Sequence, residues 1–281
     1  MGKTSSIYRG NTKPVVVVHR FGEQPYISVP HLHSSLEIYY NIKGCRSFLV
    51  NNKFYHCEPN DMFLVPVMQI HKALLKTEES YERCIISLSS EVINKINDMP
   101  NMVQKPFEIL FSTEISDSHK THLSPLEHTE FMELVHTYNR NGNDDADRFI
   151  ILLKILQFIS KKYKNDASVE KNFLPETVAD EILGYVEQNF KNKISVAQIS
   201  QRMALSDAQL YRLFKKETGM TIKEYLTVRR IAEAKKLLRL GFSVKEACFE
   251  SGFNDYPNFI KSFKKVEGYS PGQMEELNSP I

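Results

Sequence analysis

Residues 195–219 and 243–268 are two versions of one unit, and this duplication constrains the fold more than any other feature of the chain. The first copy reads SVAQISQRMALSDAQLYRLFKKETG, and the second reads SVKEACFESGFNDYPNFIKSFKKVEG. The offset is 48 residues between Ser195 and Ser243 and 49 residues between Phe214 and Phe263. The second copy therefore has one additional residue near its middle turn.

Helix start signals recur throughout the region that holds the two copies. In a capping box, a Ser or Thr side chain and a Glu or Gln three residues later each satisfy a backbone donor at the other's position. The pattern begins at Ser195, Ser206, Thr221 and Ser243. Asp255 is a further N-cap candidate, and Gly241 is a stop signal for a helix over 221–239. We expect this region to be wholly helical.

Each copy fits a helix-turn-helix, whose second helix enters the major groove of DNA. If residues 207–218 form that helix, Leu210, Leu213 and Phe214 share its core face. The opposite face suits bases, since Arg212 can pair with guanine and Gln209 with adenine. The candidate DNA contacts of the first copy are Ser206, Ala208, Gln209, Tyr211, Arg212, Lys215 and Lys216.

A shift of 49 residues transfers these positions to the second copy, with Phe259, Ser262 and Phe263 on the core face. Its candidate DNA contacts are Asp255, Tyr256, Pro257, Asn258, Ile260, Lys261 and Lys264. This face has fewer hydrogen-bonding groups, so we expect it to anchor phosphates and contact methyl groups more than it reads sequence. The alternative is that the lysine-rich helix ends are only solvated surfaces. The recurrence of both faces in phase favours DNA binding.

Residues 180–278 resemble the two-motif DNA-binding domain of AraC/XylS-type transcriptional regulators. The matching positions are Ser206, Leu210, Arg212 to Lys216, Gly219, Tyr225, Leu226, Arg230, Ala234, Leu237, Leu238, Gly252, Phe253, Phe259, Phe263 to Lys265, Gly268, Ser270 and Pro271. The resemblance implies two motifs joined by the 221–239 helix, reading double-stranded DNA in adjacent groove segments, with RNA polymerase as a partner. Where the family often has arginine in the second reading helix, this chain has Lys261, which lacks a bidentate fork.

The remaining composition suits a protein of two domains. The chain has 281 residues and a net charge of only +2, so DNA binding depends on where the charges lie. Its four cysteines show no metal-ligand spacing and predict reduced thiols in a cytoplasmic protein. We expect no secretory signal and no membrane span.

The N-terminal half changes from strand-like to helical patterns at about residue 89. Strands are predicted at 15–19, 36–42, 47–50, 53–57, 62–67 and 81–88, and helices at 127–140 and 145–163. The apolar face of the second helix (Phe149, Leu152, Leu153, Leu156, Ile159 and Tyr163) could cover the sheet and also meet a second subunit.

The expected fold is α+β, with an antiparallel β-barrel followed by helices and an all-α double helix-turn-helix. The expected divisions are a cupin-like barrel (1–90), a helical dimerisation segment (91–165), a linker (166–179) and the DNA-binding domain (180–278).

Two histidine motifs mark a candidate site in the barrel. His31-Leu32-His33-x3-Glu37 is followed by Asn60-Asp61-x4-Pro66-x4-His71, and the pair resembles the two cupin motifs, although Asn60 replaces a usual glycine. One interpretation is an organic effector site of His31, His33, Glu37, Tyr39 and His71. The other is a divalent metal held by His31, His33, Glu37 and His71. We favour the effector and expect no cofactor. Further candidates for aromatic pocket walls are Phe21, Tyr39, Tyr55 and Phe63.

These observations predict a ligand-responsive transcriptional regulator that is a homodimer through residues 127–163. Resemblance to regulators of this layout suggests an activator with a sugar as its effector. The alternatives are a metal-dependent cupin enzyme with an accessory DNA-binding domain, and a regulator that switches through a protein partner. No catalytic residues are predicted, because no nucleophile motif, phosphate loop or paired-carboxylate pattern stands out.

Overall fold

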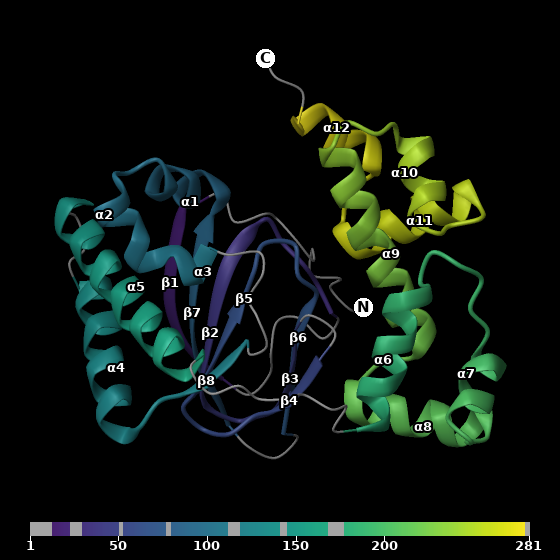
Figure 1. Cartoon of the computed structure of the whole chain (residues 1–281), viewed down its shortest axis with the longest axis horizontal. Coiled ribbons are helices and arrows are strands. Elements are labelled where there is room, and N and C mark those ends of the chain that lie inside the picture. The colour runs from purple at the N-terminus through teal and green to yellow at the C-terminus, as the bar shows by residue number, and fades with distance from the viewer. Residues whose placement is uncertain are drawn as a thin grey trace.

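The computed structural model describes residues 13–22, 30–50, 53–76, 80–111, 119–140, 145–167 and 177–278. An N-terminal part of strands and helices lies beside a C-terminal part that is wholly helical (Figure 1). This arrangement confirms the predicted fold class. The linker expected at 166–179 falls mainly on residues outside the described ranges, but α5 continues to Ala167 and α6 begins at Val178.

The strands form two antiparallel sheets. The larger has the order β1-β7-β2-β5-β8 and the smaller the order β4-β3-β6. The strands are β1 (Val15–Gly22), β2 (Ser35–Lys43), β3 (Cys45–Val50), β4 (Lys53–His56), β5 (Asp61–Val65), β6 (His71–Leu75), β7 (Tyr81–Ser89) and β8 (Lys120–His122). The six predicted strands are all present. β6 and β8 were not predicted, because one contains a buried histidine and lysine and the other has only three residues.

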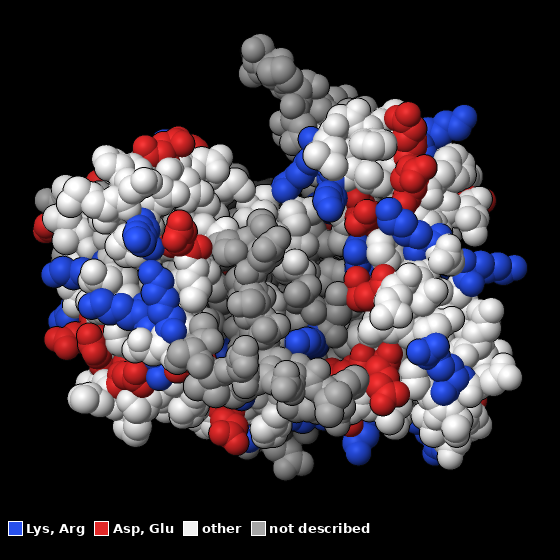
Figure 2. Space-filling view, in the orientation of Figure 1, with Lys and Arg blue, Asp and Glu red and all other residues white. Residues whose placement is uncertain are grey.

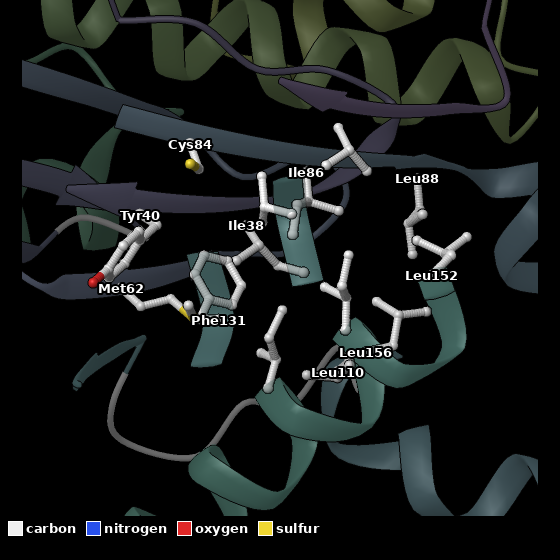
Figure 3. Packing of buried hydrophobic residues seen from close by; sticks show 14 of the residues in the cluster. Ile38, Tyr40, Met62, Cys84, Ile86, Leu88, Leu110, Phe131, Leu152 and Leu156 are labelled. Carbon is white, nitrogen blue, oxygen red and sulfur yellow. The ribbon is translucent and has the colours of Figure 1, made fainter. Parts of the chain in front are cut away.

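The larger sheet is buried on both faces. On β2, Tyr39 packs between the sheets with Phe48 and Phe63, whereas its neighbours Ile38 and Tyr40 point the other way. This alternation is the period of two that a strand imposes. The second face is covered by helices, from which Phe131 and Leu156 pack against the sheet residues (Figure 3).

The helices of the N-terminal part are α1 (Ser90–Asn97), α2 (Asn101–Gln104), η1 (Lys105–Phe107), α3 (Glu108–Phe111), α4 (Pro125–Arg140) and α5 (Asp145–Ala167). The two long helices confirm the helices predicted at 127–140 and 145–163. The apolar face of α5 is buried largely as predicted, at Leu152, Leu156 and Ile159, and the buried Ile151 and Ile155 widen it. Phe149, at 41% exposed, is an exception.

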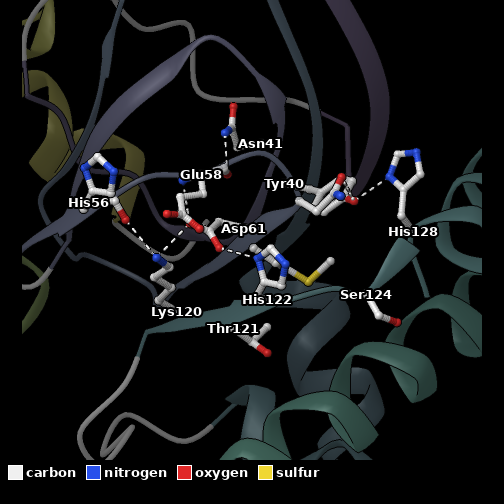
Figure 4. Close-up of polar contacts among 12 residues, drawn as sticks. Tyr40, Asn41, His56, Glu58, Asp61, Lys120, Thr121, His122, Ser124 and His128 are labelled. Atoms are coloured by element: carbon white, nitrogen blue, oxygen red, sulfur yellow. Dashed lines mark hydrogen bonds and ion pairs between the residues drawn. The ribbon is translucent and has the colours of Figure 1, made fainter. Parts of the chain in front are cut away.

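The buried carboxylate of Asp61 on β5 contacts two residues of β8, the edge strand of the larger sheet. Asp61 is 1% exposed and lies 2.8 Å from Nζ of Lys120 and 2.9 Å from Nδ1 of His122. Oδ2 of Asp61, the oxygen that contacts Lys120, also accepts a hydrogen bond from the backbone N–H of Glu58 (Figure 4). Asp61 is therefore explained as a structural residue, since a buried charge requires such partners.

The C-terminal helices are α6 (Val178–Asn189), α7 (Val196–Arg202), α8 (Asp207–Thr218), α9 (Ile222–Arg239), α10 (Val244–Glu250), α11 (Tyr256–Glu267) and α12 (Pro271–Asn278). The duplication is confirmed, because α7 and α10 each have seven residues and α8 and α11 each have twelve. The turn of the second copy, 251–255, is one residue longer than the turn of the first, 203–206.

All four predicted capping boxes form, and Asp255 caps α11 as predicted. α8 and α11 both end at a left-handed glycine, Gly219 and Gly268. α9 joins the two copies, with Tyr225 in the core of the first and Leu238 in the core of the second. Within the described ranges, no helix combines the length and the apolar character needed to cross a bilayer.

Candidate functional site

α8 presents its predicted outer face to solvent. Ser206, Ala208, Gln209, Tyr211, Arg212, Lys215 and Lys216 are all exposed. Leu210 and Phe214 on the opposite face are fully buried, and Leu213 is half-buried. The Ser206–Gln209 pair also forms the capping box, so the side-chain oxygen of Gln209 already accepts from the backbone N–H of Ser206 at 3.0 Å. Gln209 has only its amide N–H groups left for a base.

The outer face of α11 has a layout similar to that of α8 but fewer groups that can hydrogen-bond to bases. Asp255, Tyr256, Pro257, Asn258, Lys261 and Lys264 are exposed. Ile260 is half-buried and packs against the core of the second copy, so its assignment to the outer face is only partly right. The carboxylate of Asp255 accepts from the backbone N–H of Asn258 at 2.6 Å, which makes it primarily a helix cap.

Basic and acidic side chains are mixed on the face of the C-terminal part that Figure 2 shows. In the space-filling view, basic side chains project from its outer edge and acidic ones lie among them (Figure 2). The net charge of +2 likewise indicates that attraction to DNA depends on where individual basic side chains lie.

The predicted histidine site comes together at one end of the two sheets. His31 and His71 form an isolated antiparallel bridge, and their ring centroids lie 4.1 Å apart. The ring of His33 lies 4.8 Å from that of His71. Glu37 on β2 faces these rings, with Oε2 at 3.0 Å from Nε2 of His33 and Oε1 at 3.8 Å from Nε2 of His71.

Burial and close contact perturb both Glu37 and His71. Burial raises the pKa of Glu37, but the contact with His33 and the nearby His71 outweigh burial and hold the pKa below its ordinary value. Burial lowers the pKa of His71 to about 4, although Glu37 acts in the opposite direction. The site therefore combines a carboxylate with a neutral imidazole at neutral pH.

The aromatic residues near the site have different environments. The Tyr39 ring lies 4.5 Å from that of Phe48, which stacks on Phe63 at 4.4 Å, and all three are buried between the sheets. Tyr55 is half-buried and meets Phe63 at 5.8 Å. Phe21 is 81% exposed, so the prediction that it lines a pocket is wrong. It has the same parity along β1 as the buried Val17, but it lies near the end of the strand, where residues 20–22 are all exposed.

Two family models match the chain. Residues 13–141 match the AraC-like ligand binding domain, and residues 199–276 match the helix-turn-helix domain. An uncharacterised HTH-type transcriptional regulator in the cgkA 5' region of Pseudoalteromonas carrageenovora is 33% identical over 126 residues, which are 43% of this chain and 75% of that protein. The chain belongs to the AraC-type transcriptional regulators.

Other proteins are similar to this AraC-type regulator over different lengths of its chain. The uncharacterised regulator YdiP of Escherichia coli (strain K12) is 22% identical over 255 residues, which are 89% of this chain and 82% of YdiP. The structure of ToxT from Vibrio cholerae is similar over 95% of this chain and 100% of its own, at 16% identity and a TM-score of 0.40. Two further curated relatives are matched over only 13% and 46% of their lengths. All four of these curated relatives are named as transcriptional regulators or activators, as predicted.

In this regulator the smaller sheet packs against the first helix-turn-helix copy. Leu32, Leu49 and Ile70 share one apolar cluster with residues of α6, α8 and α9. Oδ1 of Asp180, in the first turn of α6, accepts from the backbone N–H of Phe54 at 3.2 Å. The ligand binding domain and the DNA-binding domain are thus in direct contact.

Two basic residues of the sheet reach the C-terminal end of α8. Nζ of Lys72 lies 3.4 Å from the carbonyl oxygens of both Thr218 and Gly219, and Arg46 donates to the carbonyl oxygen of Lys216 at 2.8 Å. A helix C-terminus carries unsatisfied carbonyl groups and partial negative charge, which cations complement. This interface was not predicted from the sequence. A lysine within the apolar run of β6 is a weak local signal, and its partners lie about 146 residues away.

Proposed function

We propose that this regulator reads DNA sequence mainly through α8 and anchors itself mainly through α11. The observation that carries the proposal is the matched geometry of the two helices. Each has twelve residues, a capped start and a left-handed glycine at its end. Each buries one face and exposes the other, and a helix so presented can enter the major groove.

The two outer faces favour different roles. Arg212 on α8 has a planar fork that suits the O6 and N7 atoms of guanine. Lys261 on α11 offers a point charge that suits a phosphate. The half-buried Ile260 leaves α11 with less apolar surface to contact bases than a fully outward side chain would supply.

We further propose that a small-molecule effector acts through the contact between the smaller sheet and the first helix-turn-helix. The candidate effector residues are His31, His33, Glu37, Tyr39 and His71. Leu32 and Ile70 lie beside these histidines in sequence and pack on the DNA-binding domain. A ligand that binds the docked and undocked arrangements unequally shifts their populations and so changes DNA occupancy.

A sugar is the effector class that we propose, because hydroxyl groups can donate to Glu37 and accept from imidazole N–H groups. Gene activation through RNA polymerase is part of the same proposal. It is supported by the name of one relative, the HTH-type transcriptional activator AarP of Providencia stuartii, which is 34% identical over 96 residues.

Dimerisation through α4 and α5 is supported by apolar side chains on their outer surface. Leu126 is 80% exposed, Ile150 51% and Phe149 41%. A second copy that covers these side chains would remove apolar surface from water.

Selection of binding sites from random DNA tests whether α8 reads the base sequence and α11 mainly anchors the protein. Arg212→Ala should weaken binding at the selected site by about 1–3 kcal/mol and relax one base position. Lys261→Ala should weaken binding to all sequences alike and lower the salt dependence of the affinity by about one ion. Lys95→Ala, an exposed site on α1, is the matched control and should change neither. Unchanged affinity and specificity in Arg212→Ala would refute the assignment of α8.

A further inference from the structure

Four side chains of the ligand binding domain converge on one point at the end of the sheets. The imidazole ligand atoms of His31, His33 and His71 all lie within 4.8 Å of one another. Glu37 completes the group, at 3.0 Å from Nε2 of His33 and 3.8 Å from Nε2 of His71. We propose that His31, His33, His71 and Glu37 bind a divalent first-row transition metal ion, with Zn²⁺ as the reference ion.

The separations suit such an ion. Bonds of about 2.0–2.2 Å to nitrogen and oxygen place neighbouring ligand atoms roughly 3–3.5 Å apart around the metal. The two contacts of Glu37 already lie near that range. Rotation of the imidazole rings by about 1 Å at their ligand atoms is enough to complete the site. Imidazole nitrogen and carboxylate oxygen are ligands that Zn²⁺, Fe²⁺ and Mn²⁺ accept.

Two of the rings are held in the orientation that metal binding needs. Nδ1 of His33 lies 2.8 Å from the carbonyl oxygen of Ser35, and Nδ1 of His71 lies 3.0 Å from that of Gln69. A carbonyl oxygen can only accept, so Nδ1 of each ring carries a hydrogen. In the neutral ring of His71 this directs the lone pair of Nε2 toward Glu37. Nε2 of His33, at 3.0 Å from Oε2 of Glu37, presents a lone pair once an ion replaces its proton. Metal-binding histidines commonly have this second hydrogen bond to a backbone carbonyl.

One ring nitrogen at the centre of the cluster has no hydrogen-bond donor facing it. Nε2 of His71 is buried and has no hydrogen-bond partner among the described residues. It faces the carboxylate of Glu37, whose side chain is only 12% exposed. A lone pair beside a buried anion is unfavourable unless a positive charge lies between them. A divalent cation would bind both the lone pair of His71 and the carboxylate of Glu37. A proton on Nε2 of His33 is the competing partner of that carboxylate.

The cluster lies directly beneath the contact with the DNA-binding domain. Leu32 separates two of the histidines, and Ile70 precedes the third; both pack on the first helix-turn-helix. Lys72 follows His71 and reaches the end of α8. Drawing the segments of His31 and His71 around an ion would therefore move interface residues. This regulatory consequence rests on the proposed function, whereas the metal site itself does not.

An ion held in this way is compatible with an organic effector. A six-coordinate ion with three imidazoles and one carboxylate has two positions open. Hydroxyl oxygens of a sugar could occupy these positions. The same residues would then bind the effector through the metal.

Zinc binding by the full chain, purified without an affinity tag, tests the proposal. The protein is treated with chelator, loaded with Zn²⁺, dialysed, and analysed for metal by mass spectrometry. We expect one ion per chain. Loading with Co²⁺ should give the visible absorption of a nitrogen- and oxygen-ligated site. His71→Ala should weaken Zn²⁺ binding by more than about 100-fold, beyond the loss typical of second-shell changes.

Two further variants control for misfolding and for zinc binding by an unrelated histidine. Glu37→Gln preserves side-chain size and should fold even if His71→Ala does not; it should weaken Zn²⁺ binding and alter the Co²⁺ spectrum. His56→Ala removes an exposed histidine at the end of β4 and should bind Zn²⁺ like the unmodified chain. A chain that retains no zinc, or variants at positions 37 and 71 that bind it with unchanged affinity, would overturn the proposal.

DNA affinity measured with and without Zn²⁺ separates the two proposals. A Zn²⁺-dependent change in affinity that His71→Ala abolishes supports the regulatory link. Stoichiometric zinc with unchanged DNA affinity refutes that link and leaves the metal site standing. Stoichiometric zinc in a chain that binds no DNA refutes the proposed function alone.

Discussion

The ion pair between Lys235 and Glu267 holds α11 to α9, and its removal tests how this fold is stabilised. Nζ of Lys235 lies 2.5 Å from Oε2 of Glu267, and the two side chains are 5% and 4% exposed. Burial lowers the pKa of Lys235, while the ion pair with Glu267 acts in the opposite direction. Lys235→Met leaves the carboxylate of Glu267 buried without its cation.

The expected cost follows from that burial. Removing one partner of a buried pair typically destabilises by about 3–5 kcal/mol, because an uncompensated charge stays behind. With a urea slope of about 2 kcal/mol per M, this cost lowers the unfolding midpoint by roughly 2 M. Replacing both partners, as in Lys235→Met with Glu267→Met, should recover most of the loss, since no charge then remains buried.

The chain has a matched control with the same geometry and different burial. Nζ of Lys95 lies 2.6 Å from Oε1 of Glu91, but these side chains are 70% and 69% exposed. Lys95→Met should leave the unfolding midpoint almost unchanged, because water screens an exposed pair. Urea denaturation, with hydrogen exchange of α11 as the local measurement, compares the variants. A loss below 1 kcal/mol in Lys235→Met, or a double variant as unstable as the sum of the two single variants, would refute the reasoning.

Two further predictions concern the contacts between segments. Lys72→Met removes a cation from the C-terminal carbonyls of α8 and should weaken the docking of the two domains by about 1–2 kcal/mol. This is the low end for charged hydrogen bonds, because the contacts of Lys72 are long. Hydrogen exchange in the last turn of α8 should rise, and unchanged exchange would contradict the role of Lys72. Gly252→Ala should destabilise the second copy by about 2 kcal/mol or more, because Gly252 has a φ of +93° and an added Cβ would lie 2.7 Å from Cα of Lys191. Gly272→Ala is its control in thermal unfolding, since an added Cβ there meets no atom within 4 Å.

The C-terminal part was predictable because its signals are local. A capping box spans four residues, and each of the four boxes lies where its sequence pattern indicates. The core and outer faces of α8 follow from a period of 3.6 residues. The prediction was only partly right at Ile260, which is half-buried and packs against the core of the second copy. Helical periodicity gives a direction on the helix but does not show how far the neighbouring core extends.

The N-terminal part was predictable only in its elements. Six strands were found from their composition, but strand order depends on contacts that a linear pattern does not contain. β1 pairs with β7, about 70 residues later, and β2 lies between β7 and β5. Alternation also left open which face each aromatic residue would occupy. Phe63 is buried between the sheets, whereas Phe21 is exposed.

The residue types alone established two capped helical copies, the exposed position of Arg212 and the identity of the histidine motifs. Each depends on residues a few positions apart, where chain geometry leaves few choices. Only the tertiary structure brought His71 to His31 across 40 residues of sequence and set Lys72 against the end of α8. Such contacts form because burial of the surrounding apolar side chains outweighs the entropy of closing long loops. That balance belongs to the whole fold, and no single segment contains it.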